Sequence, residues 1–137
     1  MAGAPAWLKP IGDAAFCAGV NRINVHHFVQ QPWDAKYKPG NAMGQWGIHL
    51  GGYQTWWKPG KAWITYLWRC QTLLQRGQYI APTATSTVSF APYASALELQ
   101  SIHRRDGETD IYFVANLSWE EGVAHCSFPP TGKQPEL

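Results

Sequence analysis

The clearest periodic segment of the chain predicts a helix over residues 61–76. Its apolar side chains recur about one helical turn apart, so that they form a single stripe. The stripe comprises Trp63, Ile64, Leu67, Trp68 and Leu74. Pro59 suits the first turn of this helix, and Gly77 suits its C-terminal cap. A shorter helix is predicted over residues 8–19, with Gly19 closing it in a left-handed conformation.

Between these helices, the pattern predicts a strand and then a long loop. The β-branched Ile23 and Val25 indicate a strand over Asn21–Phe28. Residues 30–60 contain six Gly, three Pro and four Trp and follow neither a helical nor a strand period. A loop of this length is uncommon unless it has a function, and its aromatic content argues against disorder. The order helix, strand, loop, helix is typical of βα repeats, in which function lies after the strand's C-terminal end.

Beyond residue 80 the pattern changes. Residues 81–95 are almost entirely Ala, Thr, Ser and Pro and resemble a linker. The period then becomes two, with a hairpin turn predicted at Asp106-Gly107 and strands over Asp110–Asn116 and Val123–Phe128. The fold class is therefore predicted as α/β, with a domain over residues 1–80, a linker over 81–95 and an antiparallel β segment over 96–137.

Composition narrows the classes of partner. The 137 residues suit one domain, and a net charge of +2 is too weak to indicate nucleic acid or a membrane surface. Neither a signal peptide nor a membrane-spanning apolar run is recognisable in the sequence. Cys17, Cys70 and Cys126 form no CxxC pair, so we interpret them as small buried side chains.

The aromatic excess is local and suggests a ligand. Flat rings interleaved with neutral hydrogen-bonding side chains match a pyranose, which presents apolar C–H faces and hydroxyl groups. The residues of this kind are His26, His27, Gln30, Gln31, Trp33, Trp46, His49, Gln54, Trp56 and Trp57. The alternative is that the tryptophans only pack the loop. Because successive side chains alternate across a strand, only one of His26 and His27 is expected to face a pocket.

The carboxylates limit the chemistry. Glycoside hydrolysis usually requires two of them, and residues 1–80 contain only Asp13 and Asp34. Asp13 is interpreted as a partner of the first helix's N-terminus, and the acids of the second half as solvated surface groups. No phosphate-binding loop or nucleophile elbow is present in the sequence. His26 and His49 are too loose a pattern to claim a metal site.

Three long motifs resemble glycoside hydrolase family 106, the α-L-rhamnosidase-like enzymes. These are GVNRINVHHFVQQPW (19–33), KPGNAMGQWGIHLGGYQTWW (38–57) and KAWITYLWRCQTLLQRGQ (61–78). The segment IHRRDGETDIYFVAN (102–116) also resembles a β segment near the C-terminal end of these proteins. The resemblance implies the last βα units of a (β/α)8 barrel, joined to part of a downstream β-sandwich-like domain.

The resemblance also implies a function. Family members are large secreted or periplasmic enzymes that remove terminal α-L-rhamnose from plant glycans, with two carboxylates and calcium assistance. His26, Gln31, Trp33, Trp46 and Trp56 fall on the matching motifs and are the candidate substrate-binding residues.

The strands expected to carry the acid and the base lie outside this sequence. We therefore expect an incomplete or internally deleted enzyme, in which residues 81–95 are a linker or a deletion junction. It is expected to be inactive alone, with no catalytic residue, metal ligand or cofactor site identifiable here. The alternatives are a small carbohydrate-binding module without catalysis and a non-functional remnant.

Overall fold

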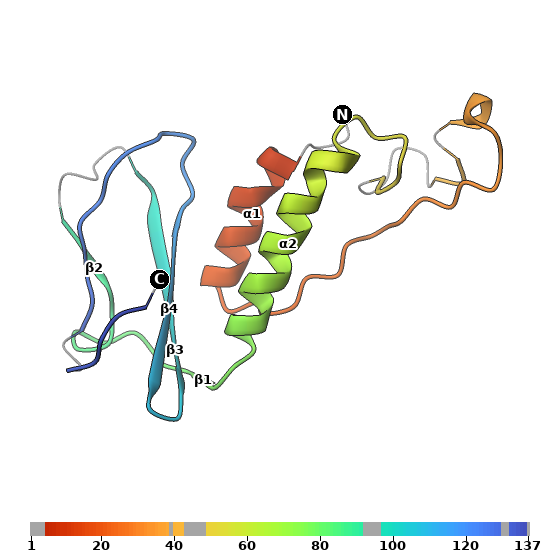
Figure 1. The fold of residues 1–137 in the computed structure, drawn as a ribbon. Helices are drawn as coiled ribbons and strands as arrows, with labels where there is room; N and C mark the ends of the chain where they lie inside the picture. Colours follow the sequence, from red (N-terminus) through yellow and green to blue (C-terminus); the bar gives the residue numbers. More distant parts are fainter. Residues whose placement is uncertain (1–4, 39, 43–48, 92–96, 130–131, 137) are drawn as a thin grey trace.

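The computed structural model of the protein describes residues 5–38, 40–42, 49–91, 97–129 and 132–136. These residues form two long helices, one three-stranded antiparallel sheet and a separate two-stranded sheet (Figure 1). The predicted α/β class is confirmed at this level. No helix among the described residues is long and apolar enough to cross a membrane.

Both predicted helices are present, with shifted ends. α1 spans Pro5–Cys17 and α2 spans Trp57–Leu74, so each begins earlier than its periodic pattern indicates. Proline is favoured in the first turn of a helix because the backbone N–H that it lacks would have no partner within the helix there. Pro5 and Pro59 occupy the first turns of α1 and α2. Gly19 and Gly77 adopt positive φ angles of 98° and 56° after the helices, as predicted for caps.

The two helices run parallel to each other. At their starts, a Cβ added at Gly60 would lie 3.8 Å from Pro5 Cγ. About two turns later, a Cβ added at Gly12 would lie 3.8 Å from Leu67 Cδ2. Because residue numbers rise together along both helices, the chain has to return along their length between them. That return is the extended segment after Gly19 (Figure 1).

The core lies between the helix pair and the larger sheet. Its buried members are Phe16, Leu67, Cys70, Leu74 and Ile102. α1 contacts both long strands of that sheet, and the ring of Phe16 meets Phe113 edge-on with centroids 5.7 Å apart. The core therefore combines side chains from the predicted first domain and from the predicted β segment.

The larger sheet has the order β1-β3-β4, with β1 at Gln78–Tyr79, β3 at Leu99–Asp106 and β4 at Thr109–Asn116. β3 and β4 form a hairpin in which Asp106 pairs with Thr109, so Gly107 and Glu108 make the turn. Gly107 has a φ angle of 57°, which suits a tight hairpin turn. The predicted hairpin is thus confirmed, with its turn one residue further along.

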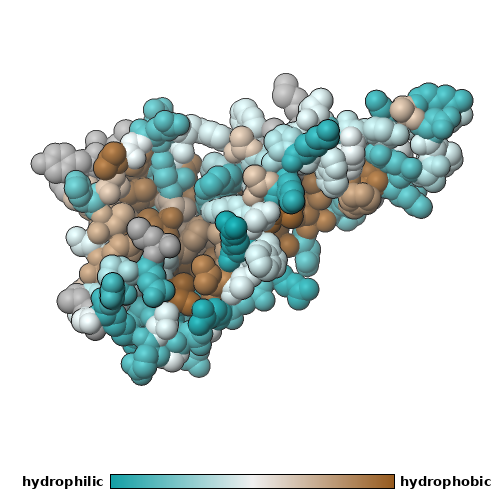
Figure 2. Space-filling view, viewed as in Figure 1, coloured by the Kyte–Doolittle hydropathy of each residue, from teal (hydrophilic) through white to brown (hydrophobic). Residues whose placement is uncertain are grey.

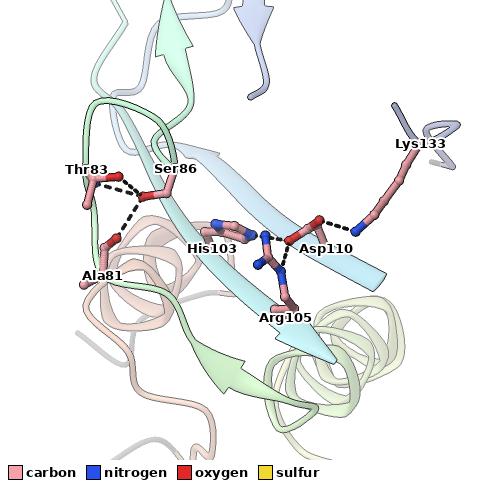
Figure 3. Close-up of polar contacts among 7 residues, drawn as sticks. All are labelled: Ala81, Thr83, Ser86, His103, Arg105, Asp110 and Lys133. Carbon is pink, nitrogen blue, oxygen red and sulfur yellow. Dashed lines mark hydrogen bonds and ion pairs between the residues drawn. The ribbon is translucent and has the colours of Figure 1, made fainter. Parts of the chain in front are cut away.

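The third predicted strand pairs differently from the expected meander. β5, Cys126–Ser127, pairs with β2, Ser89–Phe90, and not with its neighbour along the chain. β2 lies within the predicted linker, where Val88 is only 4% exposed. Just before it, Ser86 Oγ donates to the Ala81 carbonyl and accepts from the Thr83 amide, which closes a turn (Figure 3). Hydroxyl-to-backbone bonds therefore give this Ser/Thr-rich segment a defined path.

The strand predicted over 21–28 is wrong for residues 21–27, which are extended but belong to no sheet among the described residues. The Ile23 amide donates to Gln71 Oε1 at 2.5 Å, and Gln75 Nε2 donates to the Asn21 carbonyl at 2.9 Å. Glutamine side chains from the last turn of α2 and from its C-cap thus bond to backbone groups that a neighbouring strand would have paired. The prediction identified the extended conformation and not its partner.

Candidate functional site

The long loop projects from the helix pair on the side away from the larger sheet (Figure 1). We call its described residues 28–38, 40–42 and 49–56 the arm. In the space-filling view the arm forms a narrow extension with a largely hydrophilic tip (Figure 2). It leaves α1 through the extended segment 20–27 and returns directly into the first turn of α2.

Backbone hydrogen bonds close the arm at its base. The Val29 amide donates to the Leu50 carbonyl at 2.7 Å, and the Leu50 amide donates to the His27 carbonyl at 3.1 Å, which makes an isolated parallel bridge. The Asn41 amide donates to the Gln30 carbonyl at 2.9 Å in a second, antiparallel bridge. Val29 is buried between these contacts and is 2% exposed. The arm is therefore an ordered loop around one apolar side chain.

Gln31, a predicted sugar contact, is held inside the arm by two glycines. A Cβ added at Gly40 would lie 2.6 Å from Gln31 Cγ, and one added at Gly51 would lie 3.1 Å from Gln31 Nε2. Gly40 also has a φ angle of 90°, which favours glycine. Glycine is required at position 40, where the backbone oxygen of Gln30 would also lie 2.8 Å from a Cβ, whereas at Gly51 only the flexible end of Gln31 would have to shift slightly.

Trp56 packs against the start of α2. A Cβ at Gly60 would lie 2.8 Å from Trp56 Cε3, so glycine is required for the indole to rest on the helix backbone. The Gly60 amide donates to the Trp56 carbonyl at 2.7 Å. Trp56 is half-buried, and this contact fixes the point at which the arm enters α2.

Trp33 is the most open of the described candidate tryptophans. It is 54% exposed and meets Tyr37 edge-on, with ring centroids 6.3 Å apart. Lys36 Nζ lies 4.8 Å from the Tyr37 ring centroid, and Lys38 Nζ lies at the same distance from the ring of Tyr53. Cation–π contacts of this kind hold ammonium groups beside aromatic faces. The arm thus presents rings together with positive charge.

The three histidines of this region lie next to one another. The rings of His26 and His27 have centroids 4.5 Å apart, and His27 and His49 have centroids 6.3 Å apart. The two rings therefore do not alternate across the chain as they would in a regular strand, because residues 21–27 form none. That only one of them faces a pocket stays a prediction. His26 is exposed, whereas His27 Nδ1 and His49 Nε2 are buried and have no hydrogen-bond partner among the residues that the structure describes.

The structure does not gather the predicted candidates into one pocket-like cluster. No ring contact joins His26, Trp33 and Trp56 to one another in the described part of the chain, and Trp46 lies outside the described residues. Tyr37 and Tyr53, whose rings make the cation–π contacts with Lys36 and Lys38, were not among the predicted site residues. Counting every aromatic side chain of the loop, and not only tryptophan, would have found them.

Asp13 is a core residue and not a helix-terminal group as predicted. It is 0% exposed in the middle of α1, where Lys9 Nζ and the Tyr66 hydroxyl each donate to its carboxylate at 2.5 Å. Burial raises the pKa of Tyr66 far above its usual range, and the hydrogen bond to Asp13 raises it further. Burial also raises the pKa of Cys17 to about 11, with Asp13 adding to the effect. This carboxylate joins α1 to α2 and does not reach solvent.

Asp110 was also predicted to be a solvated acid, and that is wrong. Its side chain is 5% exposed and accepts from His103 Nε2 at 2.7 Å, Arg105 Nε at 2.8 Å and Lys133 Nζ at 2.6 Å (Figure 3). Burial alone would raise the pKa of Asp110, but these three donors hold it well below its usual range. With its charge neutralised in this way, Asp110 stabilises the β3–β4 hairpin.

The remaining acid of the first half, Asp34, is exposed and precedes the short 3₁₀ helix η1, Ala35–Tyr37. Its side chain makes no capping bond within the described part of the arm. No group of three His, Cys, Asp or Glu side chains that could hold a metal ion occurs among the residues that the structure describes.

Comparison with known proteins supplies the identification. The sequence model of the glycoside hydrolase 106 family, described as α-L-rhamnosidase, matches residues 1–89, which is most of the chain. The chain belongs to this family. The match covers α1, the arm, α2 and β1, so it contains every candidate site residue. The resemblance of residues 102–116 to the family lies outside this match and stays a prediction.

One curated relative supports the same assignment. It is a protein of Formosa agariphila named "Putative beta-glucuronidase", 39% identical over 93 residues. The alignment covers 68% of this chain but only 8% of the relative, so the chain spans a small part of that protein's length. No solved structure matches the chain.

Proposed function

We propose that the arm is part of the substrate-binding face of a glycoside hydrolase that removes terminal α-L-rhamnose from a glycan. The observation that carries this proposal is the family match over residues 1–89, at the centre of which lies an ordered arm with exposed rings. Trp33 is the ring best placed to stack on a sugar, and Phe28, 66% exposed and in edge contact with Trp57, is a second. Apolar sugar faces pack on such rings.

The helix arrangement supports the further proposal that residues 8–78 are βα units of a barrel. Consecutive helices of a (β/α)8 barrel run parallel, with an extended return segment between them. α1 and α2 have this relation, and residues 21–27 are the return segment. In the whole enzyme, neighbouring strands would pair with this segment, and the polar arm would lie at its C-terminal end, where barrel enzymes bind substrate.

The carboxylates support an incomplete catalytic apparatus. Hydrolysis of a glycosidic bond uses one carboxylic acid to protonate the leaving oxygen and a second carboxylate to activate water or attack carbon. Asp13 is enclosed by Lys9 and Tyr66, and Asp34 is the one acid in residues 20–60. We propose that another part of the enzyme provides the pair and that this chain alone binds without cleaving.

A uronide is a second candidate substrate, and one observation favours it. Residues 20–61 carry five cationic side chains, Arg22, Lys36, Lys38, Lys58 and Lys61, against the single acid Asp34. A local excess of positive charge attracts carboxylated sugars. The relative from Formosa agariphila has a name that refers to a glucuronide.

Binding assays test these proposals. Calorimetric titration of the chain with methyl α-L-rhamnoside and with methyl β-D-glucuronide is expected to show saturable binding of one of them. Trp33→Ala is expected to weaken that binding. The matched control is Trp68→Ala, because Trp68 is also exposed, at 64%, but lies on α2. If neither glycoside binds, or if both variants behave alike, the arm is not a sugar-binding face.

Activity assays test the negative part separately. Incubation with 4-nitrophenyl α-L-rhamnoside and 4-nitrophenyl β-D-glucuronide is expected to release no nitrophenol above a heat-treated sample. Turnover that is lost in Asp34→Asn would show that the chain holds a functional carboxylate, and the proposal of binding without cleavage would then be wrong.

A further inference from the structure

Two exposed tryptophans from distant parts of the chain meet on the surface. Trp7 lies in the first turn of α1, and Trp119 lies in the segment between β4 and β5. Their ring centroids are 5.3 Å apart and their planes are inclined by 59°. Trp7 is nevertheless 67% exposed and Trp119 is 63% exposed. We call this pair the tryptophan corner.

The corner is more than two isolated surface residues. Single exposed apolar side chains are common on soluble proteins, whereas adjoining ones form a patch that marks an interaction site. Ile11 extends the patch, since it lies four residues after Trp7 on the same face of α1 and is 68% exposed. The two indoles contact each other but leave most of their faces open to solvent.

The corner is also held in place before any ligand arrives. Trp7 belongs to a helix, and the segment that carries Trp119 is fixed by a set of local hydrogen bonds. Asn116 Nδ2 donates to the Glu120 carbonyl at 2.8 Å, and Ser118 Oγ donates to Asn116 Oδ1 at 2.8 Å. The Glu120 amide donates to Ser118 Oγ at 3.3 Å. A preformed surface loses little conformational entropy on binding.

We propose that the tryptophan corner is a second carbohydrate-binding site, which takes a neutral pyranose. One indole is expected to stack on the apolar C–H face of the sugar, and the other, inclined to it, is expected to contact the edge of the sugar ring. The exposed Glu120 and Glu121 follow Trp119 directly, and they offer acceptors for hydroxyl groups while repelling a carboxylated sugar. The arm has the opposite charge, so a carboxylated sugar is expected to prefer the arm to the corner. This site goes beyond the proposed function, because it involves none of the arm's residues.

Nuclear magnetic resonance of the indole N–H groups tests the site directly. The signals of Trp7 and Trp119 are assigned from spectra of Trp7→Ala and Trp119→Ala. Titration with methyl α-D-glucopyranoside and methyl α-L-rhamnoside is expected to shift both signals, and sodium glucuronate is expected to shift them less. Trp119→Ala is expected to weaken binding about tenfold or more, which corresponds to about 1.4 kcal/mol.

Two variants guard against a trivial result. Trp119→Phe keeps an aromatic face and is expected to retain part of the affinity, which separates lost stacking from a disturbed loop. Trp68→Ala removes an equally exposed indole that has no ring partner among the described residues, and it is expected to leave the affinity unchanged.

Three results would overturn the proposal. The first is that neither the Trp7 nor the Trp119 indole signal moves at about 100 mM neutral glycoside, because any dissociation constant would then be too large for a binding site. The second is that Trp33→Ala abolishes the shifts, which would place the binding on the arm. The third is concentration-dependent association of the chain that Trp119→Ala prevents, which would make the corner a protein interface. Failure of arm binding alone leaves this test unaffected.

Discussion

The Tyr66–Asp13 hydrogen bond provides a quantitative test of how the helix pair is held together. Tyr66→Phe removes only the hydroxyl group and leaves Asp13 Oδ1 without that donor in a position that is 0% exposed. Hydrogen bonds to charged groups contribute about 1.5–3 kcal/mol, and a buried group left unpaired adds its desolvation cost. We therefore expect a loss of about 2 kcal/mol in the free energy of unfolding.

The same site allows a comparison of its two donors. Lys9 also bonds to Asp13, but its side chain is 53% exposed, so solvent screens the pair. Lys9→Met is expected to cost about 1 kcal/mol or less. In an Asp13→Asn background, the bond to Tyr66 is neutral, and Tyr66→Phe is expected to cost about 1 kcal/mol. The double-mutant cycle thus predicts a coupling between the two positions of about 1 kcal/mol.

Urea unfolding followed by tryptophan fluorescence measures these differences. The matched control is Tyr79→Phe, because Tyr79 is 55% exposed and is expected to change stability by less than about 0.5 kcal/mol. A chain of 137 residues should show the Tyr66→Phe loss as a decrease in Tm of about 6–10 °C. If Tyr66→Phe matches the control, or costs as much in the Asn background as in the parent, the buried charge is not what makes this bond important.

Two further predictions concern the β half. Gly77→Ala is expected to lower the free energy of unfolding by more than about 2 kcal/mol, because the new Cβ would lie 2.0 Å from the Arg105 carbonyl oxygen. Gly107→Ala, at nearly the same φ but with no atom within 4 Å of the new Cβ, is expected to lower it by about 1 kcal/mol. Equal urea midpoints for the two variants would contradict this. Asp110 has a pKa lowered from 3.8, so its contribution to stability is present above the unfolded value and is lost as pH falls through the folded value. Asp110→Asn should therefore flatten the decrease in urea midpoint between about pH 5 and pH 2, and an unchanged slope would show that the ion cluster does not stabilise the fold.

The features that sequence could predict are those set by local pattern. The period of apolar residues and the positive-φ glycines Gly19 and Gly77 gave the two helices, and β-branched residues next to a glycine turn gave the β3–β4 hairpin. Each of these depends on residues within a few positions of one another. The ends of α1 and α2 were less well predicted, because the first helical turn need not contribute to the apolar stripe.

The features that sequence could not predict depend on distant partners. Asn21–Phe28 has the composition of a strand, but Gln71 and Gln75, about fifty residues away, take its backbone groups. Asp13 resembles a helix-terminal acid until Tyr66 of the second helix is placed beside it. Similarly, β5 pairs with β2 across most of the β half.

The candidate site was predicted in composition and not in arrangement. The aromatic and amide side chains of the loop could be named from the sequence, but their exposure could not. Trp33 is open, whereas Trp56 is half-buried on Gly60, and Gln31 is enclosed by two glycines. Packing decides these differences, because each depends on which backbone segments approach one another in the folded loop.

The parallel helices also relate the two proposed sugar-binding surfaces to each other. α1 and α2 start side by side, with Pro5 next to Gly60, and Trp56 rests on Gly60 while Trp7 follows Pro5 by two residues. The base of the arm and the tryptophan corner therefore lie at the same end of the helix pair. Their charges differ, with lysines on the arm and glutamates beside the corner. If the uronide is the arm's ligand, a glycan that carries both a carboxylated and a neutral sugar is expected to contact both surfaces at once and to bind more tightly than either sugar alone.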